Sequence, residues 1–313
     1  MRSGTRSRSA PALATVTVLL TLAVVVSCGR GGVPPGSVAA MMGAGENGIT
    51  PSAYPVNRSV KVEGSPTLAR AEAAHRIVIG VKSDHPFLGF EDPVTGRRFG
   101  FDVEIARMVA ADLGFGPGRI SWKTVPPQGR ETAISKGDVD FYVAAYTIND
   151  ERKKHVSFAG PYYVAGQDLL VKRGNRDING PGDLKGKRVC SVTGSTPFQR
   201  IEKPEYGAEV SSHDSYAQCV QDLISGEADA VTADDTILKG YAAQNGGRLR
   251  VVGRPFSQEP YGVGLAKGDK ALRGAINEAL ERHRDNGDWQ RAYDATLGLS
   301  GARAPKPPEV IRY

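Results

Sequence analysis

The sequence predicts an α/β protein whose sheets are largely parallel and are covered by helices on both faces. Short apolar runs typical of buried strands alternate with segments in which apolar residues recur at helical spacing. That alternation is the pattern of βαβ units, in which crossover helices cover a parallel sheet. The chain has 313 residues, which at roughly 100–200 residues per domain is enough for about two domains.

The charge balance argues against a nucleic-acid partner. The chain has 40 Lys+Arg against 34 Asp+Glu and a formal net charge of +6. Three of the basic residues, Arg2, Arg6 and Arg8, precede a long apolar run, and residues 1–27 contain no acid. The small surplus left in the rest of the chain is too weak for a nucleic-acid footprint. We therefore predict no nucleic-acid partner.

The N-terminus has the organisation of an export signal. Residues 9–29 carry no charge, and residues 13–26 form the apolar centre of that run. A basic start, an apolar stretch and small residues are typical of a secretory signal peptide. The sequence VVSC at 25–28 is similar to a bacterial lipobox, which implies cleavage after residue 27 and a lipid on Cys28. A plain transmembrane anchor is the alternative. Either one places the remainder on the extracytoplasmic face of the cell membrane.

The other two cysteines favour a disulfide. Without Cys28, only Cys190 and Cys219 remain, and an oxidising compartment favours their pairing. A reactive or metal-binding pair is the minor alternative. Their spacing alone does not establish that their Cα atoms come within about 7 Å of each other.

Both ends of the chain have the composition of irregular segments. Gly, Pro, Ser and Ala dominate from residue 29 onward, and we predict a lipid-anchored flexible linker over 28–74. The string GAGENG at 43–48 matches a dinucleotide-binding fingerprint, but no strand precedes it and no helix follows, so we reject that interpretation. Residues 300–313 contain three prolines, and we predict a flexible tail.

The folded region begins near residue 75. Predicted strands cover 76–81, 120–125, 139–144, 168–171, 188–192, 228–232 and 249–252. Predicted helices cover 103–113, 215–224, 270–284 and 289–297. Asp102 is the expected N-cap of the first helix.

An ordered set of motifs then resembles a known family. The strings are GFDVEIA at 100–106, GDVD at 137–140, YTINDERKK at 146–154, FAGPYY at 158–163, DLKGK at 183–187, GEADA at 226–230 and YGVG at 261–264. In this order they resemble the family 3 bacterial solute-binding proteins of amino-acid ABC transporters, over roughly residues 76–298. The chain looks most like the glutamate/glutamine/aspartate-binding lipoproteins of high-GC Gram-positive bacteria.

The resemblance implies a two-lobed fold of the type II periplasmic-binding-protein class. Residues 75–164 and 260–299 would form lobe 1 and residues 165–259 lobe 2, with two hinge crossings near 165–168 and 258–261. A small-molecule amino acid would bind in the cleft, and the closed lobes would dock on an ABC transporter permease. We expect a monomer without cofactor or metal.

The resemblance also assigns the residues that bind the common part of an amino acid. Arg152 matches the family arginine that binds the α-carboxylate, for which a planar bidentate donor is suited. Thr147 matches a neighbouring ligand contact, and the carbonyl of Ala145 matches an acceptor for the ammonium. Asp234 is expected to bind the ammonium and Asp235 to cap the following helix, although the reverse assignment stays open.

A second set of residues is expected near the ligand side chain. Arg130 matches a position where binders of acidic amino acids carry arginine, whereas Asp84 and Phe87 match cleft positions of glutamine binders. Lys82 would offset Asp84, and Ser195 and Thr196 precede a helix whose N-terminal groups favour an anion or a carbonyl oxygen. Because Arg130 and Asp84 favour different ligands, the expected set is glutamate, glutamine, aspartate and asparagine.

Enzyme functions find less support. The five histidines are scattered without metal-ligand spacing, and no nucleophile elbow or phosphate-binding loop occurs. Two alternatives remain open. One is an amino-acid sensor that reports to a membrane signalling partner. The other is an enzyme similar to the cyclohexadienyl dehydratases of the same fold, with Asp84 as the acid or base.

Overall fold

The computed structural model describes Met1, Gly4 and residues 54–312. Residues 54–312 belong to one compact unit. The export signal, Cys28 and the rejected GAGENG string lie outside the described residues. Within the described residues, no helix is long and apolar enough to cross a membrane.

Lobe 1 is built on a five-stranded sheet in the order β5-β1-β6-β13-β7. Its strands are β1 (Ile77–Val81), β5 (Ile120–Thr124), β6 (Phe141–Tyr142), β7 (Ser157–Ala165) and β13 (Glu259–Leu265). The pairs of β1 with β5 and β6 are parallel, whereas β13 is antiparallel to both β6 and β7. A three-stranded antiparallel sheet adjoins it, formed by β2 (Asp84–His85), β3 (Gly89–Glu91) and β4 (Arg98–Phe99).

Lobe 2 also has a five-stranded sheet, and it is formed by the segment of the chain between β7 and β13. Its sheet has the order β10-β9-β11-β8-β12, with β8 (Gln167–Lys172), β9 (Arg188–Val192), β10 (Glu209–His213), β11 (Ala230–Asp234) and β12 (Leu249–Val251). Strand β9 is parallel to β10 and β11, and β8 is antiparallel to β11 and β12. The sheets are therefore mixed: β5-β1-β6 and β10-β9-β11 are parallel, as the sequence predicts, whereas β13-β7 and β8-β12 are joined to them and to each other by antiparallel pairs.

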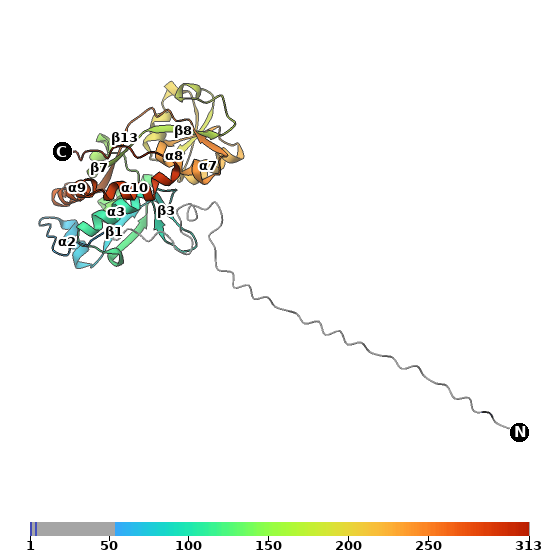
Figure 1. Ribbon diagram of the computed structural model, residues 1–313. Coiled ribbons are helices and arrows are strands. Elements are labelled where there is room, and N and C mark those ends of the chain that lie inside the picture. The colour runs from blue at the N-terminus through green and yellow to red at the C-terminus, as the bar shows by residue number, and fades with distance from the viewer. Residues whose placement is uncertain (2–3, 5–53, 313) are drawn as a thin grey trace. The chain divides into compact units, whose positions relative to one another are not determined.

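The helices follow the same division between lobes. Helices α2 (Pro66–Ala73), α3 (Phe101–Asp112), α4 (Arg130–Ser135), α5 (Asp150–Lys153), α9 (Lys270–Asp285) and α10 (Asp288–Ala295) belong to lobe 1. Helices α6 (Thr196–Ile201), α7 (Tyr216–Ser225) and α8 (Asp235–Gln244) belong to lobe 2. Short 3-10 turns are η1 (Pro117–Arg119), η2 (Pro127–Gly129), η3 (Pro181–Asp183), η4 (Pro204–Tyr206) and η5 (Leu297–Ser300). Figure 1 shows the last helices, α9 and α10, beside α3 from the start of the fold.

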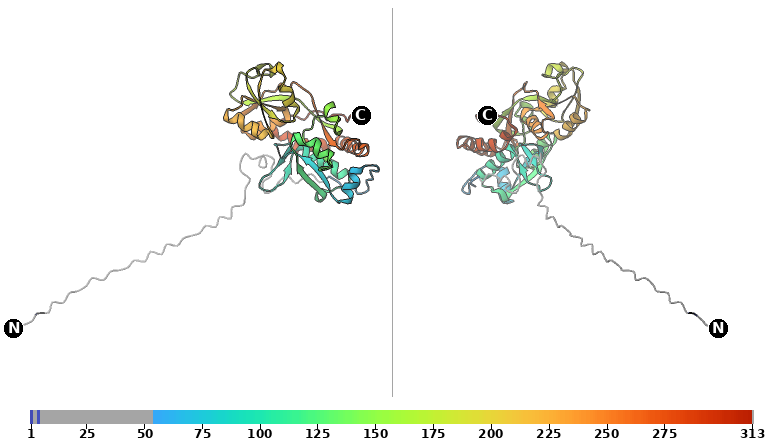
Figure 2. Two further views of the ribbon diagram at one scale, coloured as in Figure 1. Left: turned by 180° about the vertical axis from the view of Figure 1, so that it is seen from behind. Right: turned by 45° about the vertical axis from the view of Figure 1, so that its right-hand side comes forward.

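The two lobes are joined where the chain crosses twice. Strand β7 ends at Ala165 and β8 begins at Gln167, while β13 returns to lobe 1 at Glu259. In the first crossing Gln167 binds the second crossing directly, because its N–H donates to Ser257 Oγ at 2.9 Å and its carbonyl accepts from Phe256 N at 2.9 Å. In both views of Figure 2, the yellow and orange segments of lobe 2 lie together, as expected for one continuous insertion.

An aromatic cluster secures α10 to the lobe 1 sheet. Phe101 packs edge-on against Trp289 and Tyr293, and Tyr163 stacks on both rings. The indole N–H of Trp289 also donates to the carbonyl of Tyr162 at 2.8 Å. These large side chains bury apolar area and satisfy the indole N–H. The cluster stabilises lobe 1 directly behind strand β7, from which the hinge leaves.

Three local predictions were wrong. The expected linker extends too far, since α2 starts at Pro66 with Ser65 as its N-cap and Tyr54 donates to Glu104 Oε2 at 2.8 Å. The tail is also held in the described part: Ile311 N donates to Gly160 O at 2.9 Å. Asp102 does not cap α3, because Gly100 occupies the N-cap position. Apolar contacts of Val62 and Val310 with the core outweigh the irregular composition of both segments.

The disulfide predicted in lobe 2 is present in the structure between Cys190 of β9 and Cys219 of α7. The two Cα atoms lie 5.4 Å apart, within the range of native disulfides. Both cysteines are fully buried. The bond therefore fixes α7 to the strand that leads to Ser195.

The disulfide should stabilise the folded protein, because it closes a loop between two residues that are 29 positions apart in the sequence. The Cys190→Ala/Cys219→Ala double variant should lower the free energy of unfolding by about 3–4 kcal/mol, because the unfolded chain regains loop entropy. Urea unfolding of oxidised protein, reduced protein and the double variant measures the effect. Equal free energies of unfolding for the oxidised protein and the double variant would contradict a stabilising disulfide.

Candidate functional site

A narrow cavity lined by polar side chains lies between the lobes. Lobe 1 contributes residues of the β1–β2, α4 and β6–α5 segments, and lobe 2 contributes the ends of β9 and β11 with the helices that follow them. The lining residues are Lys82, His85, Pro127, Arg130, Ala144, Ala145, Thr147, Arg152, Ser195, Thr196, Pro197, Tyr216, Asp234 and Ile237.

Two arginines lie side by side on the lobe 1 wall. Arg152 Nη2 and Arg130 Nη2 both donate to the carbonyl of Gly194 in lobe 2, at 3.3 and 3.1 Å. Both guanidinium carbons also lie over the ring of Tyr146, at 5.1 and 4.0 Å from its centroid. Burial, and then the charge of Arg130, lower the pKa of Arg152 to about 10, so it is still cationic at neutral pH. Glu131 Oε1 lies 3.3 Å from Arg130 Nε and 3.9 Å from Arg152 Nε, so one carboxylate offsets part of the charge of the pair.

The position of Arg152 is set by the short helix that carries it. Asn149 caps α5 and accepts from the Arg152 N–H at 2.9 Å. The side chain then turns inward, where Nη1 donates to the carbonyl of Thr147 at 2.7 Å. Its neighbours Lys153 and Lys154 pair with acids of the same helix. Only Arg152 of this basic run is buried.

Asp234 is the acidic group of the opposite wall. It is 3% exposed, and its Oδ2 accepts from the Tyr261 hydroxyl at 2.7 Å. Its Oδ1 has no hydrogen-bond partner among the described residues. Burial, and then the nearby charge of Glu259, raise the pKa of this carboxyl to about 8. A cation placed in the cavity would favour the ionised form.

The assignment of the helix cap to Asp235 was wrong. Asp234 occupies the N-cap position of α8 but makes no capping hydrogen bond with its side chain. Asp235 is the first residue of the helix, and its Oδ1 accepts from Gly166 N at 3.2 Å while its Oδ2 binds Lys239 Nζ at 2.5 Å. It therefore ties α8 to the first hinge crossing. This leaves the Asp234 side chain free to face the cavity.

Ala145 is held in an unusual backbone conformation at the cavity. Its φ is +46°, in the left-handed region that few residues without glycine's freedom adopt. Its N–H donates to Asp102 Oδ2 at 3.0 Å, and Asp102 Oδ1 accepts from the Tyr162 hydroxyl at 2.7 Å. Burial raises the pKa of Asp102 to about 7. Asp102, expected as a helix cap, instead positions a residue of the site.

A hydrogen-bonded network links the hinge to the cavity wall. Glu259, at the start of β13, accepts from Thr196 Oγ1 at 2.8 Å, from Ser257 Oγ at 2.6 Å and from Arg200 Nη1 at 2.9 Å. Arg200 also donates to Gln167 of the first crossing. The hydroxyls of Thr147 and Thr196 lie 3.5 Å apart across the lobes. Sequence reasoning missed Glu259, Arg200 and Gln167, because their roles depend on both crossings meeting.

Of the remaining predicted residues, some line the cavity and others do not. Lys82 lines the cavity, and its Nζ lies 3.1 Å from Asp84 Oδ1. Ser195 lines it too, although its hydroxyl accepts from Phe198 N at 3.1 Å as the cap of α6. Phe87 is fully buried in the lobe 1 core and is not among the lining residues. His85 takes a place at the cavity that the sequence did not predict.

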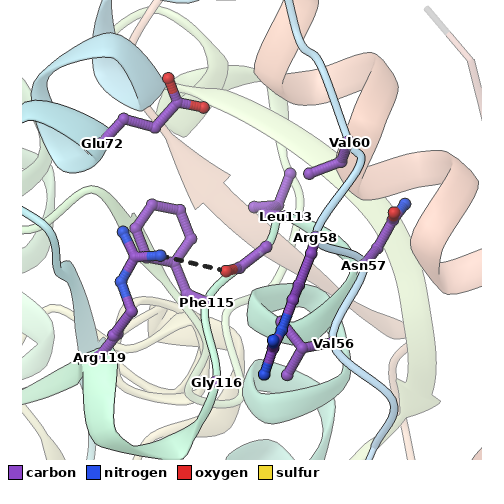
Figure 3. A pocket seen from close by; sticks show the side chains of 10 residues that line it. Val56, Asn57, Arg58, Val60, Glu72, Leu113, Phe115, Gly116 and Arg119 are labelled. Carbon is purple, nitrogen blue, oxygen red and sulfur yellow. Dashed lines mark hydrogen bonds between the residues drawn. The ribbon is translucent and has the colours of Figure 1, made fainter.

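A hollow of about 520 Å³ lies outside the cleft, at the surface of lobe 1 (Figure 3). Arg119 there stacks on Phe115 with its guanidinium carbon 4.7 Å from the ring centroid, and it donates to Gly114 O at 3.5 Å. Arg58 and Glu72, also on its wall, are exposed. The interlobe cavity is smaller, but buried groups of opposite charge converge there, so it is the better candidate for a ligand site.

The histidine and cysteine side chains do not form a free metal site in the described residues. Cys190, His213 and Asp222 lie close enough to share an ion, but the sulfur of Cys190 belongs to the disulfide. His213 Nε2 pairs with Asp222 Oδ2 at 2.7 Å, whereas Asp214 accepts from Gln128 of lobe 1 at 2.8 Å.

Comparison with known proteins identifies the family. Residues 77–298 match the model of bacterial extracellular solute-binding proteins, family 3. The chain belongs to this family. It is 40% identical over 246 residues to the glutamate-binding protein GluB of Corynebacterium efficiens, a match that covers 75% of this chain and 83% of that protein. It is 37% identical over 227 residues to the ABC transporter glutamine-binding protein GlnH of Bacillus subtilis, covering 72% and 83%.

Solved structures support the same fold. An ancestral arginine-binding protein bound to glutamine has a TM-score of 0.67 and 36% identity, covering 72% of this chain and 98% of that one. An ancestral amino acid-binding protein described as a precursor of cyclohexadienyl dehydratase has a TM-score of 0.67 and 28% identity, covering 75% and 100%. The fold class and family expected from the sequence are confirmed.

The raised pKa of Asp234 can be tested without a ligand. In the ligand-free protein the carboxyl carbon of Asp234 should titrate at about pH 8. The Glu259→Gln variant should lower this value, because it removes a neighbouring negative charge. Carbon-detected NMR titration measures both, with Asp234→Asn identifying the resonance. Titration near the ordinary aspartate value of about 3.9 would contradict the burial and charge that we describe.

Proposed function

We propose that this protein captures a polar amino acid, namely glutamate, glutamine, aspartate or asparagine, in the interlobe cavity and delivers it to an ABC permease. One observation carries the proposal: a buried arginine of lobe 1 and a buried carboxylate of lobe 2 line the same small cavity. A free amino acid has the complementary carboxylate and ammonium on one carbon. The names of the relatives GluB and GlnH agree with such a ligand.

The carboxylate of the ligand is assigned to the two arginines. Arg152 has five N–H donors and uses its two terminal nitrogens toward carbonyl oxygens of the two lobes. The remaining donors of Arg152 and Arg130 suit a planar carboxylate. Because Arg130 lies beside Arg152, we assign it to the same carboxylate rather than to the ligand side chain. The nearby hydroxyls of Thr147 and Thr196 would complete this end.

The ammonium of the ligand is assigned to Asp234, with the carbonyl of Ala145 as a second acceptor. Asp234 Oδ1 is buried without a partner among the described residues, and an ammonium would compensate it. Because the pKa of Asp234 is about 8 in the ligand-free protein, binding at neutral pH would release a proton from it. Affinity for all α-amino acids would therefore rise with pH until about pH 8.

Ligand binding would couple directly to lobe closure. The carboxylate site belongs mainly to lobe 1 and the ammonium site to lobe 2, so one ligand joins both walls. The hinge network around Glu259 adjoins Thr196 and thus connects the ligand contacts to the crossings. We propose that the closed monomer is the form that docks on the permease.

The proposed location follows from the N-terminal signal. Cleavage before Cys28 and lipidation of its thiol would tether the protein to the cell membrane on the extracytoplasmic face. The family itself consists of extracellular solute-binding proteins. We propose no catalytic step, since GluB and GlnH are named as binding proteins and a zwitterion would complement the charges of the cavity.

Arg152→Ala should remove amino-acid binding. Loss of a buried, charge-assisted contact should weaken the affinity for glutamate and for glutamine at least thirtyfold, a change of about 2 kcal/mol or more. Isothermal titration calorimetry measures the affinity. The matched control is Lys154→Ala, which removes an exposed positive charge two residues away.

The control should bind like the unmodified protein, because Lys154 points to solvent. A folded Arg152→Ala protein, verified by circular dichroism, that retains its affinity would refute the carboxylate assignment. Equal losses in both variants would show that general positive charge, and not Arg152, governs binding.

A further inference from the structure

His85 has a buried imidazole that makes no hydrogen bond to any residue in the described part of the chain. It is 3% exposed and lines the interlobe cavity, and both ring nitrogens lack a hydrogen-bond partner among the described residues. One nitrogen of a neutral imidazole donates and the other accepts. Buried polar groups are almost always satisfied. The cavity is the place from which such a partner can come.

The surroundings of His85 are polar and nearly neutral in total. Lys82 Nζ and Asp84 Oδ1 are 3.1 Å apart, and His85 Nε2 lies 3.8 Å from the same oxygen. Burial opposes ionisation of Asp84, yet its pKa is lowered by the neighbouring His85 and Lys82. The pair therefore carries one positive and one negative charge.

Other charged or titratable groups reach the same cavity from each neighbouring element. Tyr216 of α7 packs on the His85 ring with centroids 5.8 Å apart, and the Tyr241 hydroxyl of α8 donates to the carbonyl of Asp84 at 2.5 Å. The cavity is also lined by Arg130 of α4, Arg152 of α5 and Asp234 of β11.

The inference rests on the proposed function. If the two arginines bind the α-carboxylate and Asp234 binds the ammonium, then the polar lining groups left for the ligand side chain are Lys82, His85, Ser195 and Tyr216. Of these, His85 is the one whose polar side-chain atoms all lack a hydrogen-bond partner among the described residues. We propose that His85 contacts the distal group of the bound amino acid, and that it takes up a proton from solvent when that group is a carboxylate but not when it is a carboxamide.

The charge of the distal group explains why His85 would take up a proton with glutamate and not with glutamine. A carboxamide brings no charge and can bond to the neutral imidazole, while a carboxylate adds a second negative charge beside Asp84. Protonation of His85 would restore neutrality. Burial lowers the pKa of His85 to about 4 without ligand, and an adjacent anion raises such a value by about 1–3. Glutamate would thus be favoured over glutamine as the pH falls from about 7 toward 5.

The ratio of two affinities isolates this effect. Titration calorimetry of L-glutamate and L-glutamine at pH 5.5–8.0 gives Kd(Gln)/Kd(Glu), in which the proton released by Asp234 cancels because both ligands have the same ammonium. The ratio should rise as the pH falls from 7.5 to 5.5, by up to tenfold for each pH unit below the pKa that His85 has in the glutamate complex. The glutamate carboxyl itself stays ionised, with a pKa of about 4.3.

Variants then locate the proton. The ratio should become independent of pH in His85→Gln, and in His85→Asn if the first variant is unfolded by circular dichroism. His155→Gln is the control, because this histidine is exposed on lobe 1, and it should keep the pH dependence. Calorimetry in buffers of different ionisation enthalpy should show proton uptake with glutamate beyond that with glutamine.

The outcomes separate this inference from the proposed function. Binding of both ligands with a ratio that does not change with pH would overturn the role of His85 alone. The role of His85 would also be overturned if the His85 variants kept the pH dependence of Kd(Gln)/Kd(Glu). The same holds if glutamine binds at pH 5.5 and glutamate does not. If only glutamate binds, the number of protons taken up on binding is compared between the unmodified protein and His85→Gln. Equal numbers would overturn the role of His85, and a smaller number in the variant would support it. If neither amino acid binds, the proposed function fails as well.

Discussion

The cleft depends on the hydrogen bonds that the guanidinium of Arg152 makes to both lobes. It donates to the carbonyl of Thr147 in lobe 1 and to the carbonyl of Gly194 in lobe 2, so one buried cation contacts both walls. Gly194 has φ +79°, and a Cβ there would come within 3.0 Å of Gln128 in lobe 1. The absence of a side chain lets the lobe 2 backbone approach both arginines closely. A carboxylate would find its donors at this junction.

Hydrogen bonds at the hinge connect the two chain crossings to each other and to the cavity wall. Gln167 and Glu259 belong to different crossings, yet both bind Arg200, and Glu259 also binds Thr196 at the cavity. Glu259 in addition raises the pKa of Asp234. The same carboxylate therefore affects the geometry of one wall and the protonation of the other. A ligand ammonium that favours ionised Asp234 acts against this repulsion, which links ligand binding to the charge of the hinge.

Parts of this arrangement can be predicted from sequence, because they depend on local patterns. The apolar runs of β1 and β9 and the helical spacing of α9 mark those elements directly. Strands β7 and β13 were not predicted as strands, since their glycines and prolines interrupt the apolar pattern and their pairing is with each other. The order of motifs indicated Arg152 and Asp234, but only the fold shows that they line one cavity.

Individual side-chain roles were harder to predict than the fold. Asp102 and Asp235 both stand at helix starts and were expected as caps, but Asp102 binds Ala145 and Asp235 binds Gly166. A capping pattern in sequence does not distinguish a local from a long-range partner. His85 gave no signal beyond its place next to Asp84, because burial without a partner is a property of the folded cavity.

The account's central claim is that the cavity recognises the zwitterionic part of a polar amino acid. Thermal unfolding with each of the twenty amino acids, glutarate and prephenate tests it most directly, because a ligand that binds only the folded state raises the unfolding temperature. We predict that glutamate, glutamine, aspartate or asparagine gives the largest increase and that glutarate, which lacks the ammonium, gives none. No increase with any amino acid, or an increase with prephenate alone, would contradict the claim.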